Sequence, residues 1–273
     1  MDPAALDAAR DFAFAEGSHT QGVVVVRGGR IVAEWYAEGA DEGSWAASWS
    51  MAKSFTSALV GIAIDDGDIA GVDAPLTTWF PEWEGTDHAD ITLEDVLHMA
   101  SGLQWNENYG GVDSDVVRIV TTGTDHLADV LARPMATEPG STFSYSSGDT
   151  MLLSGVLERA TGVPVGDYAR ERLFDPLGMG DVDWWTDLAG STLTYCCLDM
   201  TSRDFARFGL LYLRGGAWGE EQVVPASWVE ASVTPSPTSD GGYGYQWWLL
   251  EPPLAPVSAF AARPFALDHE IPF

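Results

Sequence analysis

The segment from residue 48 to residue 67 pairs an apolar stripe with a polar stripe, and no other feature of the chain restricts its fold as strongly. The apolar stripe consists of Met51, Phe55, Leu59 and Ile62. The polar stripe consists of Ser50, Lys53, Ser54 and Ser57. Apolar spacings of four, four and three predict a helix that buries one face, and Gly67 is typical of its end.

The charge balance excludes one large class of partners. Lysine and arginine total 13 against 41 aspartate and glutamate residues, a net charge of −28, which repels phosphate backbones and anionic lipids. We therefore expect no nucleic-acid partner. Lys53 is the only lysine. An acidic, lysine-poor composition is typical of proteins from a high-salt cytoplasm; an acidic protein from a low-salt cell is the alternative.

The 273 residues, 46% of them hydrophobic, predict a packed protein of one large or two small domains. We find no internal repeat or linker and expect a single domain over residues 1–273. No basic leader and no apolar run long enough for a bilayer is present, so we expect a cytoplasmic protein without a membrane partner.

Adjacent Cys196 and Cys197 are predicted to be buried free thiols. We expect no metal and no organic cofactor.

Further elements follow from periodicity and turn residues. Two β-rich runs, 22–27 and 30–36, surround Gly28-Gly29 and predict a hairpin. The four-valine run predicts a strand covered on both faces, and residues 242–250 also read as a strand. Helical patterns occupy residues 6–14, 92–98, 115–120, 149–160, 165–177, 201–214 and 225–232.

Ser50 and Lys53 together suggest nucleophilic chemistry. They lie three residues apart at the start of the predicted helix, so both side chains share one turn near the positive end of the helix dipole. An amine beside a serine hydroxyl can take its proton, and a backbone N–H can face a developing oxyanion. The alternative is a polar helix face with a solvated lysine, although the composition retains its single lysine here.

Tyr145 is a candidate third member of the site. It precedes a predicted helix in the segment 143–149, and a phenol whose pKa is depressed by a neighbouring Lys53 could act as a general base for Ser50 and later for water. The alternative is a structural or surface tyrosine.

Several ordered strings resemble the serine β-lactamase-related hydrolases. They are SWSMAKSFTSALVGIAIDDG, ITLEDVLHMASGLQW, GSTFSYSSGDTMLLSGVLERATG, LFDPLGMGDVDWW, MTSRDFARFGLLYLRGGAW with VVPASWV, and GYGYQWW. The resemblance covers about residues 12 to 250. It is strongest to the class C-type branch, which includes carboxylesterase-like members and 6-aminohexanoate-dimer hydrolase.

The resemblance implies roles for individual residues. Ser50 and Lys53 match the family's Ser-x-x-Lys motif, and Tyr145 matches the tyrosine of its Tyr-x-Asn motif. Ser147 stands in place of that asparagine as a substrate-binding residue. Its hydroxyl has fewer donors and a shorter reach, which argues against an efficient β-lactamase. Tyr109 falls where similar oligoamide hydrolases contact substrate.

Tryptophans could line an aromatic cleft around these residues. The candidates are Trp49, Trp105, Trp247 and Trp248, and we assign Trp247 as a substrate-binding residue. Burial in the core is the alternative reading, because tryptophan is usually well buried.

The family's third motif, Lys-Thr-Gly or a His-x-Gly variant, is not found in the sequence. The sequence contains no lysine besides Lys53, and no histidine is followed two places later by glycine. We therefore expect that the last strands and the C-terminal helix have been lost through a frameshift or early stop. Such a loss would expose the edge of residues 23–26 and remove one oxyanion donor.

The resemblance implies an α/β (α+β) fold of the β-lactamase/transpeptidase type, an antiparallel sheet with flanking helices. A mostly helical lobe would span about residues 68–190 and a sheet lobe residues 1–67 and 191–273, with Ser50 at the floor of the cleft between them. The implied reaction is hydrolysis of a small-molecule amide or ester through an acyl-enzyme. A truncated, inactive homologue or binding module and a penicillin-binding transpeptidase are the alternatives. Substrate identity and oligomeric state stay open.

Overall fold

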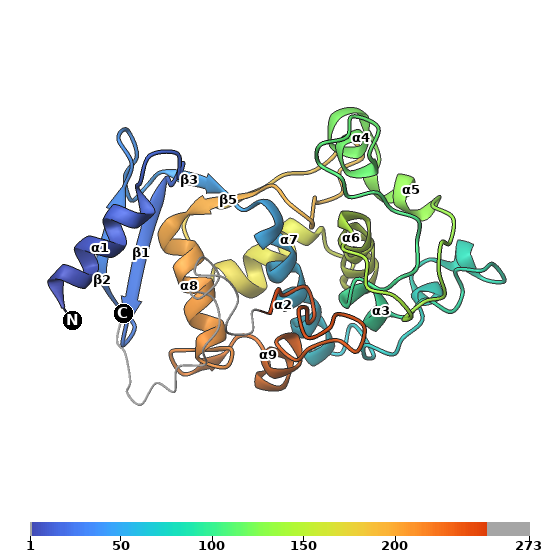
Figure 1. Cartoon of the computed structure of the whole chain (residues 1–273). Coiled ribbons are helices and arrows are strands. Elements are labelled where there is room, and N and C mark those ends of the chain that lie inside the picture. The colour runs from blue at the N-terminus through green and yellow to red at the C-terminus, as the bar shows by residue number, and fades with distance from the viewer. Residues whose placement is uncertain (1, 250–273) are drawn as a thin grey trace.

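The computed structural model describes residues 2–249, which form helices and short antiparallel strands (Figure 1). The first helix, α1 (Pro3–Ala13), begins where the Asp2 side chain accepts a hydrogen bond from the Ala4 N–H, with proline at the first helical position. Both features favour a helix start. The predicted helix at residues 6–14 therefore begins three residues earlier than its apolar spacing indicated.

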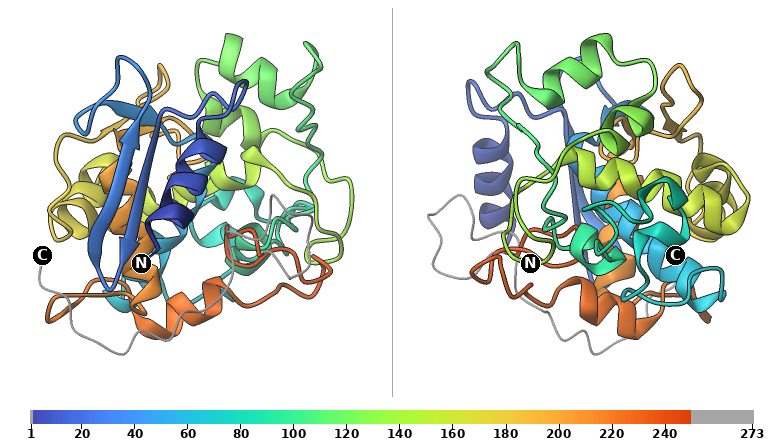
Figure 2. Two further views of the ribbon diagram at one scale, coloured as in Figure 1. Left: turned by 60° about the vertical axis from the view of Figure 1, so that its left-hand side comes forward. Right: turned by 90° about the vertical axis from the view of Figure 1, so that its right-hand side faces the viewer.

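A hairpin of β1 (Gly22–Arg27) and β2 (Arg30–Tyr36) follows, as predicted. Gly28 and Gly29 have φ of 55° and 65°, which a two-residue turn of the primed type requires. The hairpin lies between α1 and α8 (Ser202–Leu213) (Figures 1 and 2). Its valines are half-buried, so the four-valine strand is less completely covered than expected, because these two strands form a sheet of their own.

A second sheet has the antiparallel order β3 (Trp45–Ala47), β5 (Leu198–Thr201), β4 (Asp183–Trp184). A third consists of β6 (Ala217–Trp218) and β7 (Glu221–Gln222). The end of β3 is fixed to β5, since the Ser48 N–H donates to the Leu198 carbonyl at 2.9 Å and the Leu198 N–H donates to Ser48 Oγ at 3.1 Å. These bonds set the entry of the chain into the central helix.

The central helix, α2 (Ala52–Asp65), is preceded by a 3₁₀ turn, η1 (Trp49–Met51). Phe55, Leu59 and Ile62 are buried as predicted. Met51 is 51% exposed because it belongs to the turn and not to the helix, so its place in the apolar stripe is wrong. Lys53 on the polar stripe is buried as well, which makes α2 a helix enclosed on both sides.

Further helical elements follow α2 along the chain. Before α6 lie η2 (Leu76–Thr78), η3 (Pro81–Trp83), α3 (Leu93–Leu97), α4 (Asp115–Thr122) and α5 (His126–Leu131). From α6 onward they are α6 (Ser147–Thr161), α7 (Val165–Ala169), η4 (Arg170–Phe174) and α9 (Ala226–Ser232). Of these elements, α6, η4 and α9 pack against α2. The helix predicted over residues 165–177 is divided, because the backbone passes from α-helical to π-helical bonding after Ala169.

The strand expected over residues 242–250 is a tight turn as far as residue 249. Tyr243 and Trp248 form an isolated bridge, the Gly244 N–H donates to the Trp247 carbonyl at 2.9 Å, and Gln246 has a φ of 63°. The buried Gln246 amide donates to the carbonyls of Val96 and Leu97. These bonds tie the turn to α3 and override the β pattern. Residue 250 and the expected third-motif region lie outside the described residues.

Cys196 and Cys197 form a disulfide with each other, so the prediction of free thiols is wrong. That prediction rested on the strain expected of a disulfide between adjacent residues. The backbone at Cys197, however, takes a positive φ of 63°, a conformation that sequence spacing does not reveal. Cys196 is buried and Cys197 is half-buried.

None of the helices within residues 2–249 combines the length and the apolar character that crossing a bilayer requires.

Candidate active site

Ser50 sits in the η1 turn one helical turn before Lys53. Its neighbour Trp49 has a φ of 45° and is 73% exposed, and strained backbone of this kind is concentrated at functional sites. Lys53 Nζ lies 3.3 Å from Ser50 Oγ. The structure therefore brings the predicted nucleophile and amine into direct contact.

Lys53 is enclosed, with 1% of its surface exposed. Its Nζ donates to the Tyr195 carbonyl at 2.9 Å and to Ser147 Oγ at 3.2 Å. Burial lowers the pKa of Lys53 from its usual value to about 7, although the negative charge of Glu107 acts in the opposite direction. Because desolvation disfavours the ammonium, a substantial fraction of Lys53 is a neutral amine at neutral pH.

Tyr145 joins this pair from the segment that leads into α6. Lys53 Nζ lies 5.1 Å from the centre of its ring. Burial raises the pKa of Tyr145, and a side-chain hydrogen bond with Ser50 only partly opposes this effect. The expected depression of the phenol pKa is therefore wrong, because desolvation outweighs the interactions that favour the phenolate.

Ser147 and Tyr109 meet at Glu107, which the sequence reasoning missed. Glu107 Oε1 accepts from Ser147 Oγ at 2.6 Å and from the Tyr109 hydroxyl at 2.5 Å, and Oε2 accepts from the Ser147 N–H at 2.9 Å and from Trp105 Nε1. Tyr109 itself is 62% exposed. The sequence offered one signal for Glu107, because it lies two residues from both Trp105 and Tyr109. The spacing of residues in a loop does not, however, determine where such a side chain points.

The loop that carries Glu107 is held by Asp115, the first residue of α4, and by Arg133, which follows α5. Asp115 Oδ2 accepts from the Asn106 N–H at 2.9 Å, and Asp115 Oδ1 pairs with Arg133 at 2.6 Å. The Arg133 guanidinium lies 5.5 Å from the centre of the Trp105 ring. These contacts at both ends of the loop restrict its movement relative to the helices.

The two candidate tryptophans of the last described segment lie in different surroundings. Trp247 packs on α8, 5.9 Å from the Phe208 ring and 4.4 Å from the Tyr212 ring. Trp248 lies 5.2 Å from the Tyr145 ring. The structure thus brings Trp248, and not Trp247, into contact with the Ser50, Lys53 and Tyr145 group.

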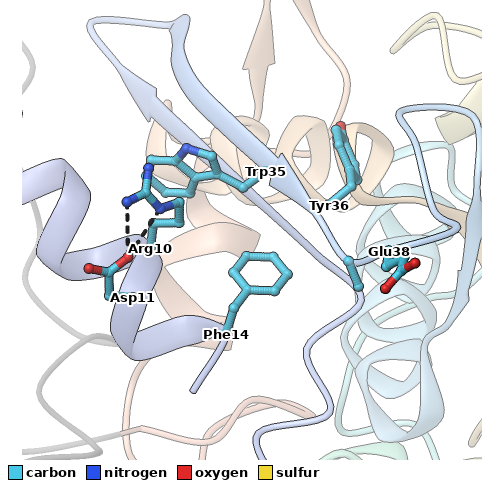
Figure 3. A pocket seen from close by; sticks show the side chains of 7 residues that line it. Arg10, Asp11, Phe14, Trp35, Tyr36 and Glu38 are labelled. Carbon is cyan, nitrogen blue, oxygen red and sulfur yellow. Dashed lines mark hydrogen bonds and ion pairs between the residues drawn. The ribbon is translucent and has the colours of Figure 1, made fainter. Parts of the chain in front are cut away.

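A separate pocket of about 530 Å³ lies between α1 and β2 (Figure 3). It is lined by Arg10, Asp11, Phe14, Trp35, Tyr36, Ala37 and Glu38. Asp11 is hydrogen-bonded to the Arg10 guanidinium at 3.0 and 3.2 Å. The pocket shares no residue with the Ser50 group. Nowhere in residues 2–249 do three His, Cys, Asp or Glu side chains gather as metal ligands would.

Comparison with known proteins identifies the family of this chain. The model of the beta-lactamase family matches residues 11–269, and the chain belongs to that family. It is 27% identical over 255 residues to 6-aminohexanoate-dimer hydrolase of Paenarthrobacter ureafaciens, a match that covers 85% of this chain and 65% of that protein. It is 31% identical over 145 residues to esterase EstB of Burkholderia gladioli, covering 47% of this chain and 36% of that one.

Solved structures share the fold. The putative 6-aminohexanoate-dimer hydrolase from Bacillus anthracis superposes with a TM-score of 0.73 at 25% identity, covering 84% of this chain and 64% of that one. A putative beta-lactamase from Bacteroides dorei gives a TM-score of 0.73 at 20% identity, covering 90% and 79%. The predicted mixed α/β fold of the β-lactamase/transpeptidase type is confirmed. The chain spans less than two thirds of the length of the Paenarthrobacter and Bacillus anthracis proteins.

Proposed function

We propose that this protein is a serine hydrolase that cleaves an amide or ester bond of a small molecule through an acyl-enzyme on Ser50. One observation carries the proposal: a buried amine with a pKa of about 7, Lys53, lies 3.3 Å from the Ser50 hydroxyl. An amine of this kind is a competent general base near neutral pH.

The hydrogen bonds of Lys53 suit proton removal from Ser50. A neutral amine has two N–H groups and one lone pair. If the N–H groups bind the Tyr195 carbonyl and Ser147 Oγ, the lone pair faces the Ser50 O–H. When Ser50 Oγ attacks the substrate carbonyl carbon, its proton passes to Lys53, and the resulting ammonium has three acceptors for three N–H groups.

Tyr145 completes the proton path in this proposal. The neutral phenol, which lies beside Ser50, passes a proton toward the leaving alcohol or amine, and Lys53 resupplies it. Water then attacks the acyl-enzyme and gives its proton to Lys53, which passes that proton to the departing Ser50 Oγ as the acid is released. The names of the relatives, a 6-aminohexanoate-dimer hydrolase and an esterase, support amide or ester substrates.

Substrate contacts are assigned to the residues around this group. We infer that the exposed Tyr109 faces the substrate. The sequence also assigned Ser147, but it is 3% exposed and its hydroxyl bonds to Glu107 and Lys53, which weighs against a direct contact. The sequence assigned a third contact to Trp247. Its packing on α8 weighs against that role and favours Trp248, which contacts Tyr145.

The test is covalent labelling by a fluorophosphonate probe, followed by hydrolysis of p-nitrophenyl esters, nitrocefin and short ω-amino-acid amides. Wild-type protein should be labelled on Ser50, and Ser50→Ala should lose labelling and lower hydrolysis by at least about 10³-fold. Ser227→Ala, on the exposed surface of α9, is the matched control. Labelling that survives Ser50→Ala would contradict the proposal.

We also propose that the chain forms a single domain over residues 1–273, with a helical lobe at about residues 68–190 against a sheet lobe from residues 1–67 and 191–273. A continuous cluster of buried apolar side chains, which includes residues of α2, α6, α8 and β5, supports one shared core.

A high-salt cytoplasm is the proposed environment. The net charge of −28 and the single lysine support it, because counterions would screen the repulsion among carboxylates.

A further inference from the structure

Glu107 is saturated by donors from its own chain. Its two oxygens accept from Ser147 Oγ, the Ser147 N–H, the Tyr109 hydroxyl and Trp105 Nε1. A carboxylate held by this many donors is fixed in direction. It is therefore suited to orient its neighbours.

The contact with Ser147 determines which way the Ser147 hydroxyl points. That hydroxyl has one proton, and it donates this proton to Glu107 Oε1 at 2.6 Å. The oxygen then presents only lone pairs to Lys53 Nζ, 3.2 Å away. Without Glu107, the hydroxyl could rotate and compete with Ser50 for the lone pair of the neutral amine.

We propose that Glu107 is a positioning residue of this site: it locks Ser147 as a hydrogen-bond acceptor for Lys53 and so keeps the lone pair of the amine directed at Ser50. The inference rests on the proposed serine-hydrolase function for its catalytic consequence, whereas the arrangement of Glu107, Ser147 and Lys53 stands on the contacts alone.

The charge of Glu107 gives a readout that does not need activity. Among the described residues, the titratable side chains that face Lys53 are Glu107, Tyr145 and Tyr195. Burial raises the pKa of both tyrosines, so they stay neutral where Lys53 titrates. Removing the Glu107 charge should therefore lower the pKa of Lys53, because the ammonium loses its nearby anion.

Carbon-13 NMR of the Lys53 Cε measures this directly, since a chain with one lysine gives one lysine signal. We expect Glu107→Gln to lower the pKa of Lys53 by at least about 0.5 unit. Asp113→Asn, which removes an exposed charge from the same loop, is the control and should move it by less than about 0.2 unit. A pKa in Glu107→Gln equal to or above that of the control overturns the proposal.

The rate of fluorophosphonate labelling tests whether Glu107 acts through Ser147. Glu107→Gln and Ser147→Ala should each slow labelling about 10-fold or more, and the double variant should be no slower than Ser147→Ala. Independent, multiplying losses would overturn the proposal. Urea unfolding of each variant shows that it is folded.

The two proposals fail in different ways. If wild-type protein is not labelled but Glu107→Gln changes the pKa of Lys53, the hydrolase function is contradicted and the contact of Glu107 with Ser147 and Lys53 is still supported. If wild-type protein is labelled on Ser50 but Glu107→Gln leaves the pKa of Lys53 unchanged, only the positioning role of Glu107 is contradicted.

Discussion

Lys53 carries both the proposed chemistry and a cost in stability. Its side chain is 1% exposed, and burying an ammonium is unfavourable unless several acceptors surround it. The three oxygens around Nζ reduce this cost without removing it, because burial still lowers the pKa to about 7. A reactive amine is thus maintained by the same desolvation that weakens the fold.

The cost should appear in the pH dependence of stability. Lys53 has a pKa of about 7 when folded and near 10.4 when unfolded, so between these values the unfolded chain binds more protons. The free energy of unfolding should therefore rise with pH across this window, by on the order of 4 kcal/mol relative to Lys53→Met. This rise in the free energy of unfolding is absent below pH 7 and complete above about pH 10.5.

Urea unfolding of both proteins from pH 6 to 10 checks this expectation. The difference between the two curves isolates Lys53, since the buried tyrosines are common to both. Parallel curves would show that Lys53 is not a desolvated amine in solution.

Sequence reasoning recovered the residues that share a helix turn and missed the one supplied by a loop. Ser50 and Lys53 are neighbours by helical geometry, so their spacing predicted their contact. Glu107 reaches Ser147 across 40 positions, and its direction depends on how the loop is anchored at Asp115 and Arg133. No local rule encodes such an anchor.

At the scale of elements, the packing of α9 on α2 depends on Gly61. A Cβ at this position would lie 2.3 Å from two ring atoms of Trp228, and Trp228 is itself buried. Overpacking of this kind costs about 1–3 kcal/mol, whereas alanine gains about 1 kcal/mol over glycine in a helix. The clash therefore exceeds the gain in helix propensity.

Gly61→Ala should lower the free energy of unfolding by about 1–2 kcal/mol. Gly209→Ala in α8 is the matched substitution, because a Cβ there meets nothing within 4 Å; it should raise stability by up to about 1 kcal/mol. Urea denaturation of the two variants measures both values. Equal effects of the two substitutions would contradict the close packing of Trp228.

Elements with a strong period were predicted well, and segments governed by tertiary contacts were not. The hairpin at Gly28-Gly29 and the helices α2, α3 and α8 agree with their patterns. Residues 242–249 have a β-rich composition, yet the buried Gln246 bonds to α3 and fixes a turn. Here a side-chain amide outweighs local β propensity, which is strongly context-dependent.

At the scale of the whole molecule, charge repulsion should dominate the response to salt. The Debye length falls from about 10 Å at 0.1 M to about 3 Å at 1 M, so most of the screening of the −28 charge occurs in this range. We expect the Tm to rise by about 10 °C or more between 0.1 and 1 M KCl and to change less above 1 M.

Differential scanning fluorimetry in a KCl series checks the response, with sorbitol as an uncharged cosolute control. A Tm that is insensitive to KCl, or that rises equally with sorbitol, would contradict a stability limited by carboxylate repulsion and with it the proposed high-salt environment.

The enclosure of the single lysine has a practical consequence for anyone handling this molecule. Activated esters, aldehydes and fluorescent isothiocyanates react with lysine ε-amino groups. The ε-amino group of Lys53, the single lysine, is buried and therefore inaccessible to them in the folded protein. Coupling at Lys53 should therefore become efficient only when the fold opens, so that the extent of modification at this residue reports unfolding.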